Sequence, residues 1–135
     1  MGQLLKIGRK DRLKVAIIED DPVQSLFWRL SLERRYGPRI SIETYTDPRE
    51  GLEKLTPDTD LALVDWLMPH LDGAELIRLA TERGIDPKKI VVFSVKPAEE
   101  IRKRFGSQAC LAIIEKGNPS QEDALFQILD KLILS

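Results

Sequence analysis

The fold of this chain is decided by the stretch Val15-Ala16-Ile17-Ile18-Glu19-Asp20-Asp21-Pro22. Its four apolar residues, three of them β-branched, predict a short buried strand. Acidic residues follow where that strand must end. Asp21 and Pro22 then combine a strong helix N-cap with a proline at the first helical position. The stretch therefore predicts a strand, an acidic turn and a helix in immediate succession.

The same succession recurs along the whole chain. Apolar runs predict strands at residues 15–18, 40–45, 61–64, 90–93 and 110–114, and apolar residues at helical spacing predict a helix after each, the last covering residues 119–134. Continuous apolar strands separated by amphipathic helices are typical of a parallel sheet that is covered on both faces. We therefore expect an α/β fold of five βα units, doubly wound by right-handed crossovers.

The first and last predicted helices each carry an apolar stripe. In the first helix, the main stripe consists of Val23, Leu26, Phe27 and Leu30. Trp28 lies off this stripe, so we expect it to be partly exposed. In the last helix, the predicted buried stripe consists of Leu125, Ile128, Leu129, Leu132 and Ile133.

Composition excludes several classes of protein. The chain has 135 residues, and its 21 basic and 22 acidic side chains give a net charge of −1, which argues against nucleic-acid binding by a bulk positive surface. One Cys and one His exclude a disulfide framework, a multi-Cys zinc site and a His-rich metal site, so any metal must be a hard cation held by oxygen ligands. No apolar run could insert into a membrane, and we expect a cytoplasmic protein.

The chain divides into a short extension and one domain. Residues 1–12 are basic and too poor in apolar residues for a signal peptide, so we expect a solvated, flexible extension, with a docking arm for an acidic partner as the alternative. Residues 13–135 are predicted to form a single domain.

Chemically distinctive residues follow the predicted strands. Glu19 and Asp20 end the first strand, Asp65 the third and Ser94 the fourth, while Lys116 follows the fifth. Ligands of such folds bind beyond the carboxyl ends of the strands, so we expect these side chains to converge. Carboxylates from two strands need a counter-charge, and Mg²⁺ suits oxygen ligands. Asp65 could then attack a phosphoryl group, which Lys116 would neutralise and Ser94 would hydrogen-bond.

These residues carry a resemblance to a known family. The matching pieces are Val15 to Pro22, Leu63-Val64-Asp65-Trp66-Leu67-Met68-Pro69, Asp72-Gly73, Val91-Val92-Phe93-Ser94 and Lys116. In this order, over residues 13–135, they resemble the receiver domain of two-component response regulators. The resemblance implies a flavodoxin-like (βα)5 sandwich whose five parallel strands lie in the order 2-1-3-4-5.

The resemblance also implies a role for each matching residue. Asp65 resembles the phosphoacceptor. Glu19 and Asp20 resemble the acidic pair that holds Mg²⁺ together with Asp65 and the backbone carbonyl of Leu67. Ser94 resembles the switch hydroxyl, and Lys116 resembles the lysine that pairs with the phosphoryl group. Such a domain is a phosphoacceptor rather than a turnover enzyme. It implies a histidine kinase or histidine phosphotransfer protein as donor, and an output domain or downstream protein at the face formed by the fourth helix, fifth strand and fifth helix. The resemblance leaves open whether the domain forms a homodimer.

Several positions depart from the family pattern. Ile113 stands where the family has an aromatic switch residue, Gly117 where it has a proline after the lysine, and Val95 where it has a very small residue. The chain therefore has no aromatic ring at this position with which a movement of Ser94 could be coupled. In the family, the positions of Leu67 and Lys96 flank the attacking water. Neither of these side chains can accept a hydrogen bond from it, so we expect a long-lived aspartyl phosphate.

Two other functions stay open. The departures at Val95, Ile113 and Gly117 are compatible with a pseudo-receiver, a domain that is never phosphorylated and acts only by binding a partner. A Mg²⁺-dependent aspartyl phosphatase is disfavoured, because Asp65 follows the third strand and Trp66 and Leu67 supply no second acid. Lys96 and Pro97 imitate the family's lysine-proline pair but follow the fourth strand, so Lys116 keeps the role. Whether the receiver stands alone or is part of a longer regulator is left open.

Overall fold

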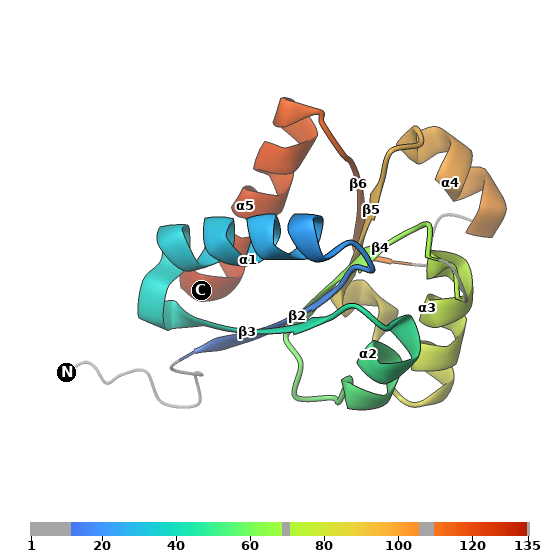
Figure 1. The fold of residues 1–135 in the computed structure, drawn as a ribbon, viewed down its shortest axis with the longest axis horizontal. Coiled ribbons are helices and arrows are strands. Elements are labelled where there is room, and N and C mark those ends of the chain that lie inside the picture. The colour runs from blue at the N-terminus through green and yellow to red at the C-terminus, as the bar shows by residue number, and fades with distance from the viewer. Residues whose placement is uncertain (1–11, 69–70, 106–109, 135) are drawn as a thin grey trace.

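The computed structural model describes residues 12–68, 71–105 and 110–134, whose centre is one five-stranded sheet (Figure 1). Its strands, labelled as in the figure, are β2 (Leu13–Ile18), β3 (Ile40–Tyr45), β4 (Leu61–Asp65), β5 (Ile90–Ser94) and β6 (Ala112–Glu115). They lie in the order β3-β2-β4-β5-β6, and each neighbouring pair is parallel. In chain order this is 2-1-3-4-5, so the predicted fold is confirmed.

Among the described residues, five α-helices cover the two faces of the sheet (Figure 1). The helices are α1 (Pro22–Tyr36), α2 (Pro48–Lys54), α3 (Gly73–Glu82), α4 (Ala98–Phe105) and α5 (Pro119–Leu134). Alternate residues of the strands point to opposite faces. In β2, Val15 and Ile17 belong to the core cluster with α1 and α5, whereas Ala16 and Ile18 belong to the cluster with α2, α3 and α4. The strands are thus buried on both sides, as their continuous apolar runs predict.

Aspartates begin three of these helices. The side chain of Asp21 accepts a hydrogen bond from the backbone N–H of Val23 at 2.9 Å, so its predicted role as the N-cap of α1 is confirmed. Asp47 and Asp72 cap α2 and α3 in the same way. Because Asp21 is engaged as a cap, the acidic turn after β2 has only Glu19 and Asp20 available for other chemistry.

The buried face of α1 differs from the sequence prediction. Val23, Leu26, Phe27 and Leu30, the predicted main stripe, are 75%, 54%, 58% and 50% exposed. Trp28, expected to be partly exposed, is buried and stacks on Phe93 of β5 with ring centroids 4.6 Å apart. The prediction was wrong because α1 has apolar residues on two faces, and the face with the larger aromatic surface packs on the sheet.

The buried stripe of α5 was predicted correctly in part. Leu125 and Leu129 are fully buried, and Ile128 and Ile133 are half-buried. Leu132 is 39% exposed, which contradicts its predicted place in the stripe.

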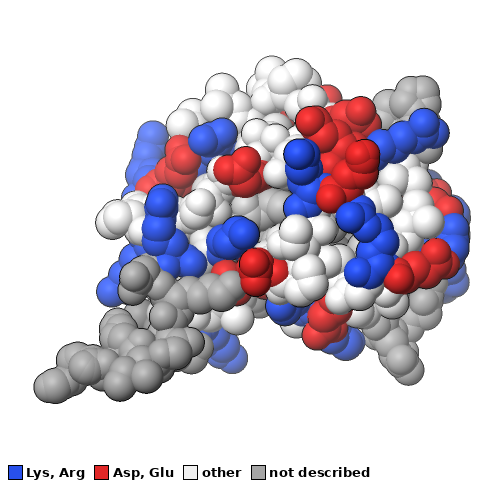
Figure 2. All heavy atoms as spheres, turned by 90° about the horizontal axis from the view of Figure 1, so that it is seen from below, with Lys and Arg blue, Asp and Glu red and all other residues white. Residues whose placement is uncertain are grey.

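The surface carries both charges. On the face shown in Figure 2, acidic and basic side chains are interspersed over the described residues, consistent with the near-neutral net charge. Within the described ranges, every helix is too short or too polar to cross a bilayer. The predicted extension lies outside the described residues apart from Arg12, whose guanidinium donates to the backbone carbonyl of Ile40 at 3.3 Å.

Candidate functional site

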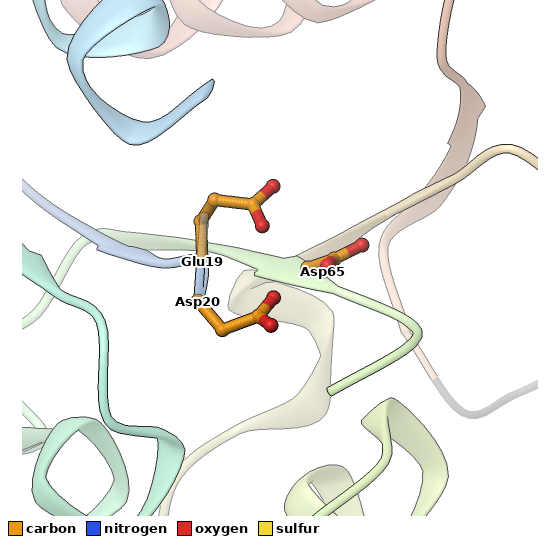
Figure 3. A group of neighbouring side chains, drawn as sticks. All are labelled: Glu19, Asp20 and Asp65. Atoms are coloured by element: carbon orange, nitrogen blue, oxygen red, sulfur yellow. The ribbon is translucent and has the colours of Figure 1, made fainter. Parts of the chain in front are cut away.

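The acidic side chains come together at the carboxyl edge of the sheet. Glu19 and Asp20 directly follow β2, and Asp65 is the last residue of the neighbouring strand β4. Figure 3 shows the carboxylates of Glu19 and Asp20 extending from the end of β2 toward the side on which Asp65 lies. One carboxylate oxygen from each of the three residues lies within 4.8 Å of the others. The convergence predicted from the strand ends is thus present.

Lys116 faces this acidic group from the end of β6. Its ammonium donates to Glu19 Oε1 at 3.0 Å and lies 3.1 Å from Asp65 Oδ1. The side chains of Lys116, Glu19 and Asp65 are only 15%, 5% and 9% exposed, so these charges are weakly screened by solvent. Lys96, the competing lysine in the sequence, instead lies 3.7 Å from Glu100 on the surface of α4, so it takes no part in this ion pair.

The surroundings shift the pKa of all three groups. Burial raises the pKa of Glu19 to about 7, although the hydrogen bond from Lys116 acts in the opposite direction. Burial also raises the pKa of Asp65 against the opposing charge of Lys116. For Lys116, burial alone would lower the pKa, but its hydrogen bonds and ion pairs with Glu19 and Asp65 outweigh burial and raise it. The ammonium is therefore firmly charged, whereas the buried carboxylates lack sufficient counter-charge.

The donor set fits a hard divalent cation. Three carboxylates face one ammonium, which leaves an excess of negative charge in a largely buried place. All three side chains would bind a metal through carboxylate oxygens, the ligand type that Mg²⁺ prefers. A divalent cation beside Glu19, Asp20 and Asp65 would remove the electrostatic cost of keeping them ionised.

Ser94 lies beside this group at the end of β5. It is 1% exposed, and its hydroxyl oxygen accepts a hydrogen bond from the backbone N–H of Lys96 at 2.9 Å. Its backbone carbonyl accepts from the N–H of Lys116 at 2.7 Å, so the ends of β5 and β6 are tied together next to the acidic group. Its role as a switch hydroxyl stays a prediction.

The positions that depart from the family pattern have distinct surroundings. Leu67 and Val95, after β4 and β5, are 50% and 70% exposed, whereas Ile113 is buried in the core cluster on the side of α2, α3 and α4. Gly117 has a φ of +79° and donates its N–H to Glu122 Oε2 at 3.0 Å. Proline could supply neither that φ nor that N–H, which explains why this chain has glycine here.

One residue of the site, Gln24, was not predicted from the sequence. The side-chain oxygen of Gln24, on the first turn of α1, accepts a hydrogen bond from the Lys116 ammonium at 2.7 Å. An uncharged amide gives little signal in a sequence. Its place one helical turn after the acidic pair was the only available indication.

Comparison with known proteins agrees with this geometry. Residues 15–130 match the model of the response regulator receiver domain. The chain is 38% identical over 69 residues to the transcriptional regulatory protein FlgR of Helicobacter pylori, covering 50% of this chain and 17% of that protein. It is 30% identical over 103 residues to the probable C4-dicarboxylate response regulator DctR of Halalkalibacterium halodurans, covering 74% and 44%. The chain thus spans less than half the length of these curated relatives.

A solved structure shares the fold. The response regulator TrrA of Thermotoga maritima, solved in complex with Mg²⁺-BeF, has a TM-score of 0.70 at 21% identity, and the match covers 89% of this chain and 98% of that one. The family match spans most of the chain, and the acidic group and lysine lie together at the sheet edge. This chain belongs to the response regulator receiver domain family.

Proposed function

We propose that Asp65 accepts a phosphoryl group from a histidine kinase or a histidine phosphotransfer protein, in a Mg²⁺-dependent reaction. The observation that carries this proposal is the Asp65 carboxylate, buried at the sheet edge with the Lys116 ammonium 3.1 Å away and two further carboxylates within 4.8 Å. An oxygen of Asp65 would attack phosphorus, the bond from phosphorus to the histidine nitrogen would break, and the nitrogen would leave with the electron pair. Lys116 would neutralise the oxygens of the transferred group.

The proposed cation ligands are Glu19, Asp20, Asp65 and the backbone carbonyl of Leu67. When bound, Mg²⁺ would supply positive charge for the negatively charged phosphoryl group. The solved TrrA structure, which contains Mg²⁺ and BeF, supports this assignment by analogy. Ser94 would donate its hydroxyl hydrogen to a phosphoryl oxygen, because the N–H of Lys96 engages only the acceptor side of that hydroxyl.

The exposed stripe of α1 supports a docking surface for the phosphodonor. Large apolar side chains gathered on one helix face are typical of a protein interaction site. The helix begins at Pro22, just after the acidic pair, so a partner on Val23, Leu26 and Phe27 would lie near Asp65. We propose an apolar helical surface of the phosphodonor as its occupant. The face of α4, β6 and α5 stays the proposed contact for an output domain or a downstream protein.

The competing functions have less support. Holding the Lys116 ammonium between two buried carboxylates costs desolvation free energy. A pseudo-receiver that is never phosphorylated would have no need of this arrangement. A phosphatase would need a second acid beside the nucleophile, but Trp66 is buried in the core and Leu67 is apolar. The proposed chemistry needs a phosphorylated histidine donor, which favours the cytoplasm as its compartment.

The direct test is phosphorylation by a small donor. The chain would be incubated with acetyl phosphate and Mg²⁺ and followed by intact mass. We expect a gain of one phosphoryl group that is lost in Asp65→Asn and without Mg²⁺, and that persists in Asp123→Asn, a matched change on the exposed side of α5. No mass gain in the wild-type chain would support the pseudo-receiver instead.

A further inference from the structure

Gln24 is a neutral hydrogen-bond acceptor of the Lys116 ammonium, beside the two carboxylates. The Lys116 Nζ atom lies 2.7 Å from Gln24 Oε1, compared with 3.0 Å from Glu19 Oε1 and 3.1 Å from Asp65 Oδ1. The ammonium thus donates hydrogen bonds to Glu19 and Gln24 and forms an ion pair with Asp65. Gln24 makes the shortest of the three contacts, so it helps to fix the position of this lysine.

The orientation of the Gln24 amide is chemically determined. Its nitrogen donates to Asp21 Oδ2 at 3.3 Å, and its oxygen accepts from Lys116. The reverse orientation would place an N–H group against an ammonium and an oxygen against a carboxylate, both of which repel. Asp21 is itself held as the N-cap of α1, so the amide is anchored to the start of that helix.

The three partners of the ammonium differ in what else they must do. Glu19 and Asp65 are proposed cation ligands, so their oxygens are shared between the ammonium and the metal. Gln24 is neutral and has no such competing task. Of the three contacts, the one with Gln24 is therefore the one that can persist unchanged when the cation and the phosphoryl group are present.

We propose that Gln24 is a positioning residue for phosphoryl transfer, which holds the Lys116 ammonium in place beside Asp65 from the first turn of α1. This inference rests on the proposed function, since it assigns a role within the same reaction. A positioning role differs from a purely structural one. A residue that only stabilised the start of α1 would affect neither the position of the Lys116 ammonium nor the rate of phosphoryl transfer.

The first test observes the ammonium directly in the ion-free chain. The lysine side-chain ammonium signals would be recorded by proton-nitrogen NMR at mildly acidic pH, and the Lys116 signal assigned by its loss in Lys116→Arg. Gln24→Met and Gln24→Ala both remove the acceptor and suit a helix. We expect hydrogen exchange of the Lys116 ammonium with water to be about fivefold faster in both variants. Gln24→Glu, which keeps an acceptor oxygen, and Gln127→Met, a matched change at an exposed position of α5, should retain slow exchange.

The second test measures phosphorylation by acetyl phosphate with Mg²⁺. We expect the maximal rate of Gln24→Met and Gln24→Ala to fall about tenfold, with the donor concentration for half-maximal rate unchanged, because a displaced lysine affects transfer rather than donor binding. Gln127→Met should match the wild type.

The outcomes separate this inference from the proposed function. Unchanged exchange in both acceptor-free variants, or faster exchange with a maximal rate within about twofold of the wild type, would overturn the positioning role alone. A wild-type chain that gains no phosphoryl group would overturn the proposed function and this inference with it.

Discussion

The carboxylate of Glu115 accepts a hydrogen bond from the backbone N–H of Ala98 at 3.0 Å, so the last residue of β6 caps the first turn of α4. Glu115 pairs with Ser94 across the sheet and directly precedes Lys116. The start of α4 is thereby tied to the two strand ends that carry the proposed switch and lysine residues. With Ile113 buried in place of an aromatic residue, this contact is a direct physical link between the site and α4.

We expect Glu115→Ala to destabilise the chain by about 1 kcal/mol, since it leaves an N–H at the start of a helix without its acceptor. Glu115→Gln, which keeps an acceptor oxygen, should cost less. Urea unfolding gives the free energies, and amide hydrogen exchange should increase chiefly in α4. The matched control is Glu53→Gln on the exposed side of α2. Equal stability of Glu115→Ala and the wild type would show that the cap contributes nothing.

The site also predicts how stability depends on pH without divalent ions. Burial raises the pKa of Glu19 from its ordinary value of 4.5 to about 7, so the folded chain holds a proton that the unfolded chain releases across this range. The free energy of unfolding should therefore fall as pH rises through that window, and the raised pKa of Asp65 acts in the same direction.

Glu19→Gln removes this titration, so its stability should change less with pH than that of the wild type. Thermal unfolding between pH 4.5 and 7 measures the difference. Glu43→Gln, at an exposed position of β3, is the control and should follow the wild type. Added Mg²⁺ should reduce the decline in the wild type, because a bound cation favours the ionised carboxylate. If the stability of the wild type and that of Glu19→Gln changed equally with pH, the raised pKa of Glu19 would be contradicted.

The surroundings of Asp65 predict a slowly hydrolysed phosphoryl group. Leu67 is half exposed and cannot orient a water molecule, and the Lys96 ammonium cannot accept its proton. We expect Leu67→Gln to speed the loss of the phosphoryl group on the order of tenfold, the effect of one hydrogen bond that orients the attacking water. Intact mass after donor removal follows the decay. Leu132→Gln, a similar change at an exposed leucine of α5, should not alter it. Wild-type decay complete within seconds would refute this prediction.

The two aromatic neighbours in α1 should respond unequally to truncation. Trp28→Ala should cost about 3–5 kcal/mol, because Trp28 is buried and stacked on Phe93. Phe27→Ala should cost much less, at most about 1.5 kcal/mol, because the Phe27 side chain is 58% exposed and its ring makes an edge contact with Trp28. Urea unfolding compares the two.

In phosphotransfer from a phosphorylated histidine partner, Phe27→Ala should slow transfer while leaving phosphorylation by acetyl phosphate unchanged. Equal effects on both donors would argue against a docking surface on α1.

The sequence predicted the sheet and the acidic site because both follow from local rules. Apolar runs identify buried strands, Asp21 and Pro22 mark a helix start, and parallel strands bring their ends to one edge. The face of α1 could not be chosen this way, since two of its faces repeat apolar residues at helical spacing and only the fit of Trp28 against the sheet decides between them.

Gln24 and Glu115 escaped prediction for a different reason. Each acts through a single hydrogen bond to a residue distant in the chain, Lys116 and Ala98 respectively. Periodicity and capping motifs describe neighbours along the sequence, so contacts of this kind become visible only once the strand ends are placed side by side.

The two tryptophans lie in different core clusters, and one of them can serve as an intrinsic fluorescent probe of the site. Trp66 directly follows Asp65 and packs so closely against Gly73 that a side-chain carbon at that glycine would lie 2.8 Å from the indole ring, whereas Trp28 belongs to the cluster on the opposite face of the sheet. In a Trp28→Phe chain, tryptophan fluorescence would arise from Trp66 alone. Its emission would then record cation binding and phosphorylation at the neighbouring carboxylate in real time, without any attached dye.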